Sequence, residues 1–451
     1  MCYCSNELFK NLKSSVLFTF CTKLRNIKKR KKESKLIYSK QDVLHNEYQS
    51  IKNGAASTIA ISLSNNYFIL FAIAILGATN YQVGLISSLP SIVGMAAMLP
   101  AAFMVNKLEE KRKFTAYSIF FTRFFLLIMV FLPFIKSEHI SWFFVILIAL
   151  MNFPGTFLNL SWQAFIGDLI PADRRNTFFG NRNRILTFTG MVVTLVAGFC
   201  MKSISSKSAL PYQLLFLFAF VFGMIEFYYI LKHKEEKQTI ETSTHYSPFS
   251  KHLFQYKPYI TFLVCALFFN FAWQMAWSLF SIYQIRYAHA TAFWISLFTV
   301  SNQLSQIVSF RWWAKMANRY SNTQLLIWIS IGMASAPILN ILSTNYIYLF
   351  FVNFTSGFFV SGTVLILFNS LLESTEEEHR TSYIANYNFL LSIVAFIAPQ
   401  VGVFLLESFS MNTAMIMSTI FRGLSGVLFG VMAYKMSHSN QLDYKRDKIS
   451  F

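Results

Sequence analysis

The chain has 451 residues, of which 55% are hydrophobic and only 13% are charged, with 50 Phe. Soluble domains carry about 25% charged residues, so this composition excludes an ordinary soluble protein. The formal net charge is +19, but the basic residues gather between long apolar runs. That distribution is typical of a membrane protein, and no nucleic-acid partner is expected.

Residues 1–53 form a basic tail that holds 12 of the 39 Lys and Arg residues. Its apolar residues, among them Leu8, Leu12 and Val16, fall at helical spacing between lysines. The tail is therefore either a helix lying on anionic lipid or a solvated segment that reinforces membrane topology. We favour the solvated segment. Its apolar patch is too short for a secretory signal peptide.

Apolar runs follow, and each is long enough to cross about 30 Å of hydrocarbon. A spanning segment must satisfy its own backbone hydrogen bonds, so the runs predict helices, and the alternating pattern of a barrel is absent from the sequence. We therefore expect an all-α membrane protein with twelve transmembrane helices. The predicted spans are 54–78, 80–105, 114–135, 140–166, 185–203, 212–231, 259–282, 292–313, 324–343, 347–368, 383–407 and 412–435.

The basic residues also predict the orientation of these spans. The tails and the loops of one side hold 33 of the 39, while the opposite loops hold only Lys136, Lys202, Lys207 and Arg286. Because an excess of Lys and Arg marks the cytoplasmic side, we expect a multi-pass protein of the cell membrane with both termini in the cytoplasm. An even number of spans is needed for that arrangement.

Two polar segments are repeated along the chain. Residues 173–183 return as 378–388, with Asn181 matching Asn386 at an offset of 205 residues. The stretch around Asn106 returns around Asn318 at an offset of 212 residues. Repeated loops between apolar runs are typical of a transporter with two equivalent halves.

These repeats divide the chain into domains. The N-terminal bundle covers 54–231 and the C-terminal bundle covers 259–435. The polar segment 232–258 joins them as a cytoplasmic central loop. A cytoplasmic C-terminal tail follows at 436–451.

The loop after the second span resembles the signature G-x-x-x-D-R-x-G-R-R of the Major Facilitator Superfamily. Ala102 stands for the first Gly, Asn106 for Asp, Lys107 for Arg, and Lys111-Arg112 for the basic pair. The segments 85–90 and 175–182 are similar to bacterial members without an assigned substrate. The resemblance implies two six-helix bundles around a central cavity that opens alternately to each side of the membrane.

The resemblance also implies a cytoplasmic gate of basic and amide residues, which would hold the bundles together when the cytoplasmic side is closed. The alternative is that these residues only obey the positive-inside bias. Asn106 and Asn318 lack the carboxylate of the family signature, which weakens a charge-assisted latch. The candidate gate residues are Asn106, Lys107, Arg112, Arg175, Asn318, Arg319 and Arg380.

In the family fold, the first helix of each group of three lines the cavity. The corresponding spans begin at 54, 140, 259 and 347, and they carry polar and tryptophan residues at helical spacing. Such stripes either line the cavity or join helices by hydrogen bonds. The candidate substrate-binding residues are Asn65, Asn152, Asn159, Trp162, Gln163, Asn270, Trp273, Gln274, Trp277, Asn353 and Ser356.

These four spans carry no charge deep in the membrane, so we expect a neutral or amphipathic solute. Three charges lie within other spans. Glu226 is expected to pair with a nearby base on a helix away from the cavity, with proton carriage as the alternative. Arg123 and Arg422 are expected to join a buried polar network or to contact the substrate.

The sequence lacks a phosphate-binding Gly-Lys-Ser/Thr loop and a zinc-binding HExxH motif, so we predict no enzyme and no cofactor. We predict a secondary active or facilitative transporter that works by alternating access. The first alternative is a proton-coupled multidrug efflux antiporter, and the second is a membrane receptor or assembly factor that does not transport. Expected partners are a small-molecule substrate, the lipid bilayer and a coupling proton or sodium ion, and we expect a monomer.

Overall fold

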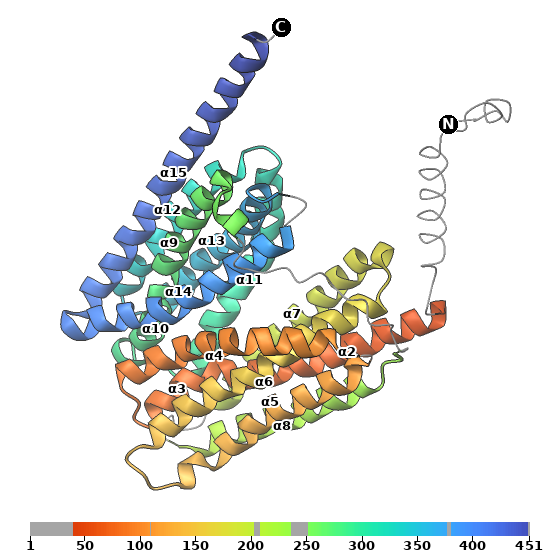
Figure 1. Cartoon of the computed structure of the whole chain (residues 1–451). Coiled ribbons are helices and arrows are strands. Elements are labelled where there is room, and N and C mark those ends of the chain that lie inside the picture. The colour runs from red at the N-terminus through yellow and green to blue at the C-terminus, as the bar shows by residue number, and fades with distance from the viewer. Residues whose placement is uncertain (1–38, 109, 203–207, 236–250, 377–379, 450–451) are drawn as a thin grey trace, which may run out of the picture.

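The computed structural model describes residues 39–108, 110–202, 208–235, 251–376 and 380–449, which are helical with short connections (Figure 1). The helices are α2 (Lys40–Ser64), η2 (Asn65–Tyr67), α3 (Phe68–Ala74), α4 (Asn80–Asn106), α5 (Lys111–Phe131), η3 (Leu132–Phe134), α6 (Ile140–Leu169), α7 (Ala172–Lys202), α8 (Leu210–Leu231), η4 (Lys251–Phe254), α9 (Lys257–Met275), α10 (Trp277–Ile282), η5 (Tyr283–Tyr287), α11 (Ala292–Ala317), α12 (Asn322–Ile341), α13 (Tyr346–Glu373), α14 (Arg380–Ser408) and α15 (Met411–Ile449).

Eleven helical segments within the described residues are long and apolar enough to cross a membrane. The predicted span at 292–313 corresponds to α11, which has 26 residues and is long enough to cross. Its polar residues, including Asn302, Gln303 and Gln306, lower its hydropathy. Because α11 packs between α13 and α7, these side chains are shielded from lipid in part by protein.

The twelve helical segments form two bundles of six with the same internal order. Around the first bundle the neighbours follow the order α7, α2, α8, α5, α6, α4, and around the second they follow α14, α9, α15, α12, α13, α11. Position by position, the second set lies six spans after the first. The two pseudo-symmetric six-helix bundles predicted from the repeats are therefore present, and they meet where α4 packs on α14 and α7 packs on α11.

Helices extend beyond the spans predicted from hydropathy. The N-terminal tail was predicted to reach residue 53, but α2 begins at Lys40, where the Ser39 side chain accepts a hydrogen bond from the Asp42 amide. At the other terminus α15 continues to Ile449, through most of the predicted C-terminal tail. Helical hydrogen bonding continues outside the hydrocarbon, so helix ends and apolar ends need not coincide.

The repeated polar segments are helical where the structure describes them. Residues 173–183 form the first turns of α7, which corrects their prediction as a loop. Residues 380–388 form the first turns of α14, whose predicted span began at residue 383. In the central loop, residues 236–250 lie outside the described part of the chain. The basic tail before residue 39 also lies outside it.

The apolar cores show how the bundles are joined. One cluster contains buried residues of both bundles, such as Tyr67 and Phe71 with Leu279 and Val403. The other three clusters each belong to one bundle. The shared cluster lies at the end predicted to face outward, and Figure 1 shows the bundles diverging from that end. The molecule is therefore closed at the predicted outer end.

Each bundle begins with an interrupted helix. The first span changes from α2 to α3 through η2 at Asn65–Tyr67, and the seventh is interrupted at Ala276 between α9 and α10. Such breaks leave backbone groups without helical partners in mid-span. Gly402 of α14 lies against the second break, where an added Cβ would be 2.1 Å from the Met275 carbonyl oxygen.

We expect Gly402→Ala to destabilise the protein by about 1–3 kcal/mol, because the methyl group would overlap a backbone atom that cannot move without shifting α9. Gly423→Ala is the matched control, since an added Cβ at Gly423 meets nothing within 4 Å. Thermal unfolding of the purified variants in one detergent measures the difference. Equal unfolding midpoints for the two variants would show that α14 does not approach the break this closely.

Candidate functional site

The first bundle contains a cavity of about 370 Å³ lined by α2, α5, α6, α7 and α8. Its volume is in the range of small-molecule sites. Asn65, Asn152, Asn159 and Trp162 line it, as do apolar residues of α2, α6 and α7. Amide, aromatic and apolar groups therefore meet in one wall.

A buried ion pair lies in the wall of this cavity. The Arg123 guanidinium of α5 lies 2.8 Å from a carboxylate oxygen of Glu226 on α8, and both side chains are nearly inaccessible. Arg123 also donates to the Ser57 hydroxyl of α2 at 3.0 Å, and Asn53 donates to the Glu226 backbone carbonyl at 2.9 Å. The expected pairing of Glu226 with a base is present.

The position of Glu226 corrects one expectation. It was placed on a helix away from the cavity, but both Glu226 and Arg123 line the cavity wall. Gly223 accounts for this geometry, because a Cβ there would overlap the Arg123 side chain at 2.5 Å. With only a hydrogen at Gly223, the arginine crosses from α5 to α8 and reaches the carboxylate.

A second arginine in this wall was missed by sequence reasoning. Arg182 of α7 is 9% exposed, and its guanidinium lies 4.4 Å from the centroid of the Trp162 ring. Its Nε–H donates to the Ser50 carbonyl at 3.3 Å. Arg182 belongs to the repeated segment that was interpreted as a cytoplasmic loop, which is why it was not considered for the cavity.

The second bundle contains a cavity of about 260 Å³ between α9, α10, α11, α12, α13 and α15. Trp273 and Trp277 meet there edge to face, with ring centroids 5.8 Å apart. The Asn302 amide donates to the Asn353 carbonyl at 3.1 Å, and Ser356 also lines the wall. This wall is rich in aromatic surface and in amide groups.

Arg422 of α15 lines the second cavity and is fully buried. It donates to three backbone carbonyls, those of Ala272 at 3.2 Å, Trp273 at 2.8 Å and Met333 at 2.8 Å. Ala272 and Trp273 are in the last turn of α9, whose carbonyls lack helical partners because the helix is interrupted. Arg422 therefore supports the break in the seventh span.

Three predicted substrate-binding residues lie outside both cavities. Gln163 is exposed on α6. Asn270 and Gln274 are buried within the second bundle, where Asn270 donates to the Ala266 carbonyl and to the Tyr387 hydroxyl. Helical spacing correctly predicted that Asn270 and Gln274 share one face of α9 with Trp273. In the structure, Asn270 and Gln274 point into the bundle, and Trp273 lines the cavity. Asn302 and Asn340 line the second cavity and were missed because α11 and α12 were not considered.

Two of the predicted gate residues, Lys107 and Arg112, contact groups of their own bundle. Lys107 lies 3.8 Å from the Phe103 ring centroid, and Arg112 donates to the His233 carbonyl at 2.7 Å. Burial lowers the pKa of His233 to about 4, so this imidazole is neutral near pH 7. Asn318 and Arg319 are exposed, and Arg380 begins α14. The side chains of Asn106 and Arg175 lie outside the described atoms.

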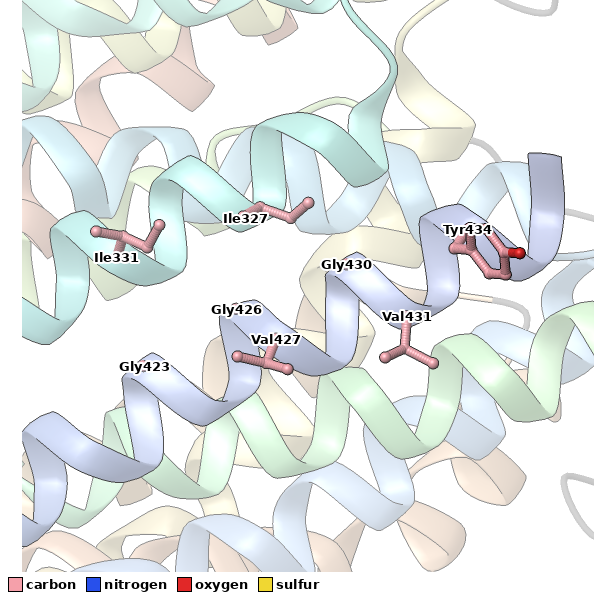
Figure 2. Close-up of a pocket in the computed structure, with 8 residues that line it drawn as sticks. All are labelled: Ile327, Ile331, Gly423, Gly426, Val427, Gly430, Val431 and Tyr434. Carbon is pink, nitrogen blue, oxygen red and sulfur yellow. The ribbon is translucent and has the colours of Figure 1, made fainter.

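A third hollow, of about 450 Å³, lies between α12 and α15 (Figure 2). Gly423, Gly426 and Gly430 form its floor, and isoleucine and valine side chains flank them. The exposed Ile331 and Val427 place it on the outer apolar face of the bundle. With only the Tyr434 hydroxyl as a polar side-chain group, it is a poor site for a polar solute.

Replacing one partner of the buried ion pair should lower the stability of the protein more than replacing both partners. We expect Glu226→Met to lower stability by about 3–5 kcal/mol, because Arg123 would stay buried without its partner. The double variant Arg123→Met with Glu226→Met should recover most of that loss. Thermal unfolding in detergent measures both, and additive losses in the double variant would contradict the pairing.

No curated protein sequence matches the chain. Among solved structures, the nucleoside transporter NupG has a TM-score of 0.64 at 13% identity and covers 86% of this chain and 98% of its own. A bacterial homolog of the human lysosomal transporter Spinster has a TM-score of 0.64 at 11% identity, with 88% and 98% covered.

A bacterial metal transporter has a TM-score of 0.63 at 16% identity, with 87% and 99% of the chains covered. At such low identity, these likenesses establish a shared fold. The Major Facilitator Superfamily sequence profile matches residues 54–309 and 262–448, nearly the whole membrane region. Together with the paired bundles of six helices, this match shows that the chain belongs to the Major Facilitator Superfamily of membrane transporters.

Proposed function

We propose that this transporter moves a small solute across the cell membrane by alternating access, as a secondary active or facilitative carrier. The observation that carries the proposal is the joining of the bundles at one end. Four hydrogen bonds and the largest apolar cluster connect them there. A contact surface made of a few hydrogen bonds and packed apolar side chains can separate and re-form, as alternating access requires.

The closed end is defined by these four hydrogen bonds. Tyr67 and Ser296 share a buried hydrogen bond of 2.8 Å, whereas the Asn80 amide donates to Glu407 at 2.6 Å in an exposed position. Gln400 donates to the Ser88 hydroxyl at 2.8 Å, and Arg286 donates to the Ala78 carbonyl. We propose that this set is the outer gate.

The opposite end carries the start of α2, the end of α15 and the predicted cytoplasmic gate. There the apolar clusters are separate, and Lys107 and Arg112 contact groups of their own bundle. This arrangement supports an inward-facing state with both termini cytoplasmic. The Spinster homolog of similar fold is inward-facing and unoccupied, which is consistent with the same assignment.

The two cavities support a small amphipathic solute, because each wall combines amides and tryptophan with apolar side chains. Glu226 favours one specific alternative, proton-coupled efflux, because it is the carboxylate among the residues that line the cavity and intramembrane carboxylates commonly serve in the proton relays of transporters. We propose a proton rather than sodium as the coupling ion for that reason. A monomer suffices for this mechanism, because one chain supplies both walls.

A disulfide at the closed end should trap the inward-facing state. The built Cβ of Gly198 on α7 lies 2.6 Å from the Ser296 Cβ on α11, so a small shift would reach the Cβ separation of a disulfide, about 3.8 Å. In a background with all five natural cysteines (Cys2, Cys4, Cys21, Cys200 and Cys265) replaced by Ser, Gly198→Cys with Ser296→Cys should cross-link on oxidation. Adding Asn159→Cys provides an exposed thiol in the cavity.

We expect the oxidised protein to react with a membrane-impermeant thiol reagent at position 159 only from the cytoplasmic side. After reduction, the position should react from both sides. The same double-cysteine protein without the change at 159 corrects for labelling of the other two thiols. Labelling from outside in the fully cross-linked protein would rule out the outer gate. Labelling that stays cytoplasmic after reduction would favour a receptor that does not transport.

A further inference from the structure

We propose that the solute is an amphipathic organic anion whose oxyanion group binds Arg182. This inference rests on the proposed transport function and names the chemical class of its solute. It refines the expectation of a neutral or amphipathic solute, which was based on four spans without deep charges. Arg182 reaches the cavity from α7, outside those four spans.

The guanidinium of Arg182 is held in a fixed position. Trp162 covers one side at 4.4 Å, and Gly54 of α2 is so close that an added Cβ would lie 2.5 Å from a terminal nitrogen. The Nε–H donates to the Ser50 carbonyl. A planar group clamped in this way presents its remaining edge in a defined direction, which lowers the entropy cost of binding.

The two terminal amino groups of Arg182 have no acceptor among the residues that the structure describes, although the residue lines the cavity. A guanidinium carries five N–H donors, and only the one on Nε is bonded to protein here. Two parallel N–H groups match the two oxygens of a carboxylate or a similar oxyanion. The free edge of Arg182 is therefore complementary to such a group.

The charge balance of the cavity points the same way. Arg123, Arg182 and Glu226 are the charged residues among those that line it. Glu226 forms its ion pair with Arg123, which leaves the wall with one positive charge in excess. Burying a cation without a counter-charge costs several kcal/mol in proteins. A bound anion would offset that cost, whereas a cationic solute would raise it.

The second bundle supplies an internal comparison. At the repeat offset of 205 residues, Arg182 corresponds to Tyr387 and Gly54 corresponds to Tyr259. Tyr387 is buried and its hydroxyl accepts from Asn270, so a neutral ring fills the equivalent place. The fold therefore does not require a cation at this position. The first bundle has both the cation and the glycine that makes room for it.

The rest of the wall indicates the remainder of the solute. Ile61, Met151, Leu158 and Leu186 line the same cavity, with the Asn152 and Asn159 amides between them. An apolar or aromatic body with one oxyanion group would contact both kinds of surface. Because Glu226 also lies in the wall, a singly charged group is favoured over a doubly charged one.

Ligand-induced thermal stabilisation of the purified full chain tests the proposal, because binding to the folded state raises the unfolding midpoint. The probes are matched sets with one body, such as indole-3-acetate, indole-3-acetamide and tryptamine, together with benzoate, benzamide and phenyl phosphate. Apparent affinities come from titration of each probe. We expect the carboxylates to bind at least about tenfold more tightly than their amides.

Arg182→Tyr, which introduces the residue type of the second bundle, and Arg182→Gln should each remove this preference. The matched control is Arg184→Gln on the exposed side of α7, which should retain it. Equal or weaker binding of every carboxylate than of its amide would overturn the proposal, and so would a preference that survives Arg182→Tyr. If the Arg182 variants fold poorly, the comparison of carboxylates with amides on the wild-type protein still tests the proposal.

The outcome is independent of the test of alternating access, which measures thiol labelling and needs no solute. Charge-selective binding with a closed end that never opens would leave an anion receptor in place of a transporter. Opening without selectivity for anions would leave a transporter of another solute class. Stronger stabilisation by phenyl phosphate than by benzoate would contradict the preference for a singly charged group.

Discussion

The structure depends on how two arginines are accommodated among apolar helices. A guanidinium in the membrane is costly unless its N–H groups find acceptors. Arg123 on α5 is bonded to Glu226 on α8 and to Ser57 on α2, while Arg422 on α15 is bonded to carbonyls of α12 and α9. In the pseudo-symmetric order, α5, α8 and α2 correspond to α12, α15 and α9. Both bundles thus join the same three positions, with the arginine on a different helix.

This difference gives the two walls unlike chemistry. In the first bundle, the acceptor is the carboxylate of Glu226, so the wall contains a buried ion pair. In the second bundle, the acceptors are the backbone carbonyls of an interrupted helix, and the arginine stabilises that break. One wall combines two arginines and a carboxylate with amide groups, and the other combines a single arginine with aromatic and amide groups.

The polar stripes on the predicted cavity spans were only partly informative. Asn152, Asn159 and Trp162 lie in the wall, whereas Asn270 and Gln274 of an equally regular stripe are buried inside the second bundle. Helical spacing predicts which residues share a face of the helix, but it does not predict whether that face contacts water or another helix. Arg182 shows the opposite case, because it lies in a segment read as a loop and yet reaches the cavity.

The sequence by itself determined the class of the protein, because the length of apolar runs, the bias of basic residues and the repeats are local properties of the chain. It also determined the repeat offset that pairs Arg182 with Tyr387. Only the tertiary structure decided which polar groups are bonded to other protein groups and which remain available to a ligand. The partners of Glu226 and Arg422 lie on helices distant in sequence. Whether a buried charge is compensated depends on such contacts, and no periodic pattern encodes them.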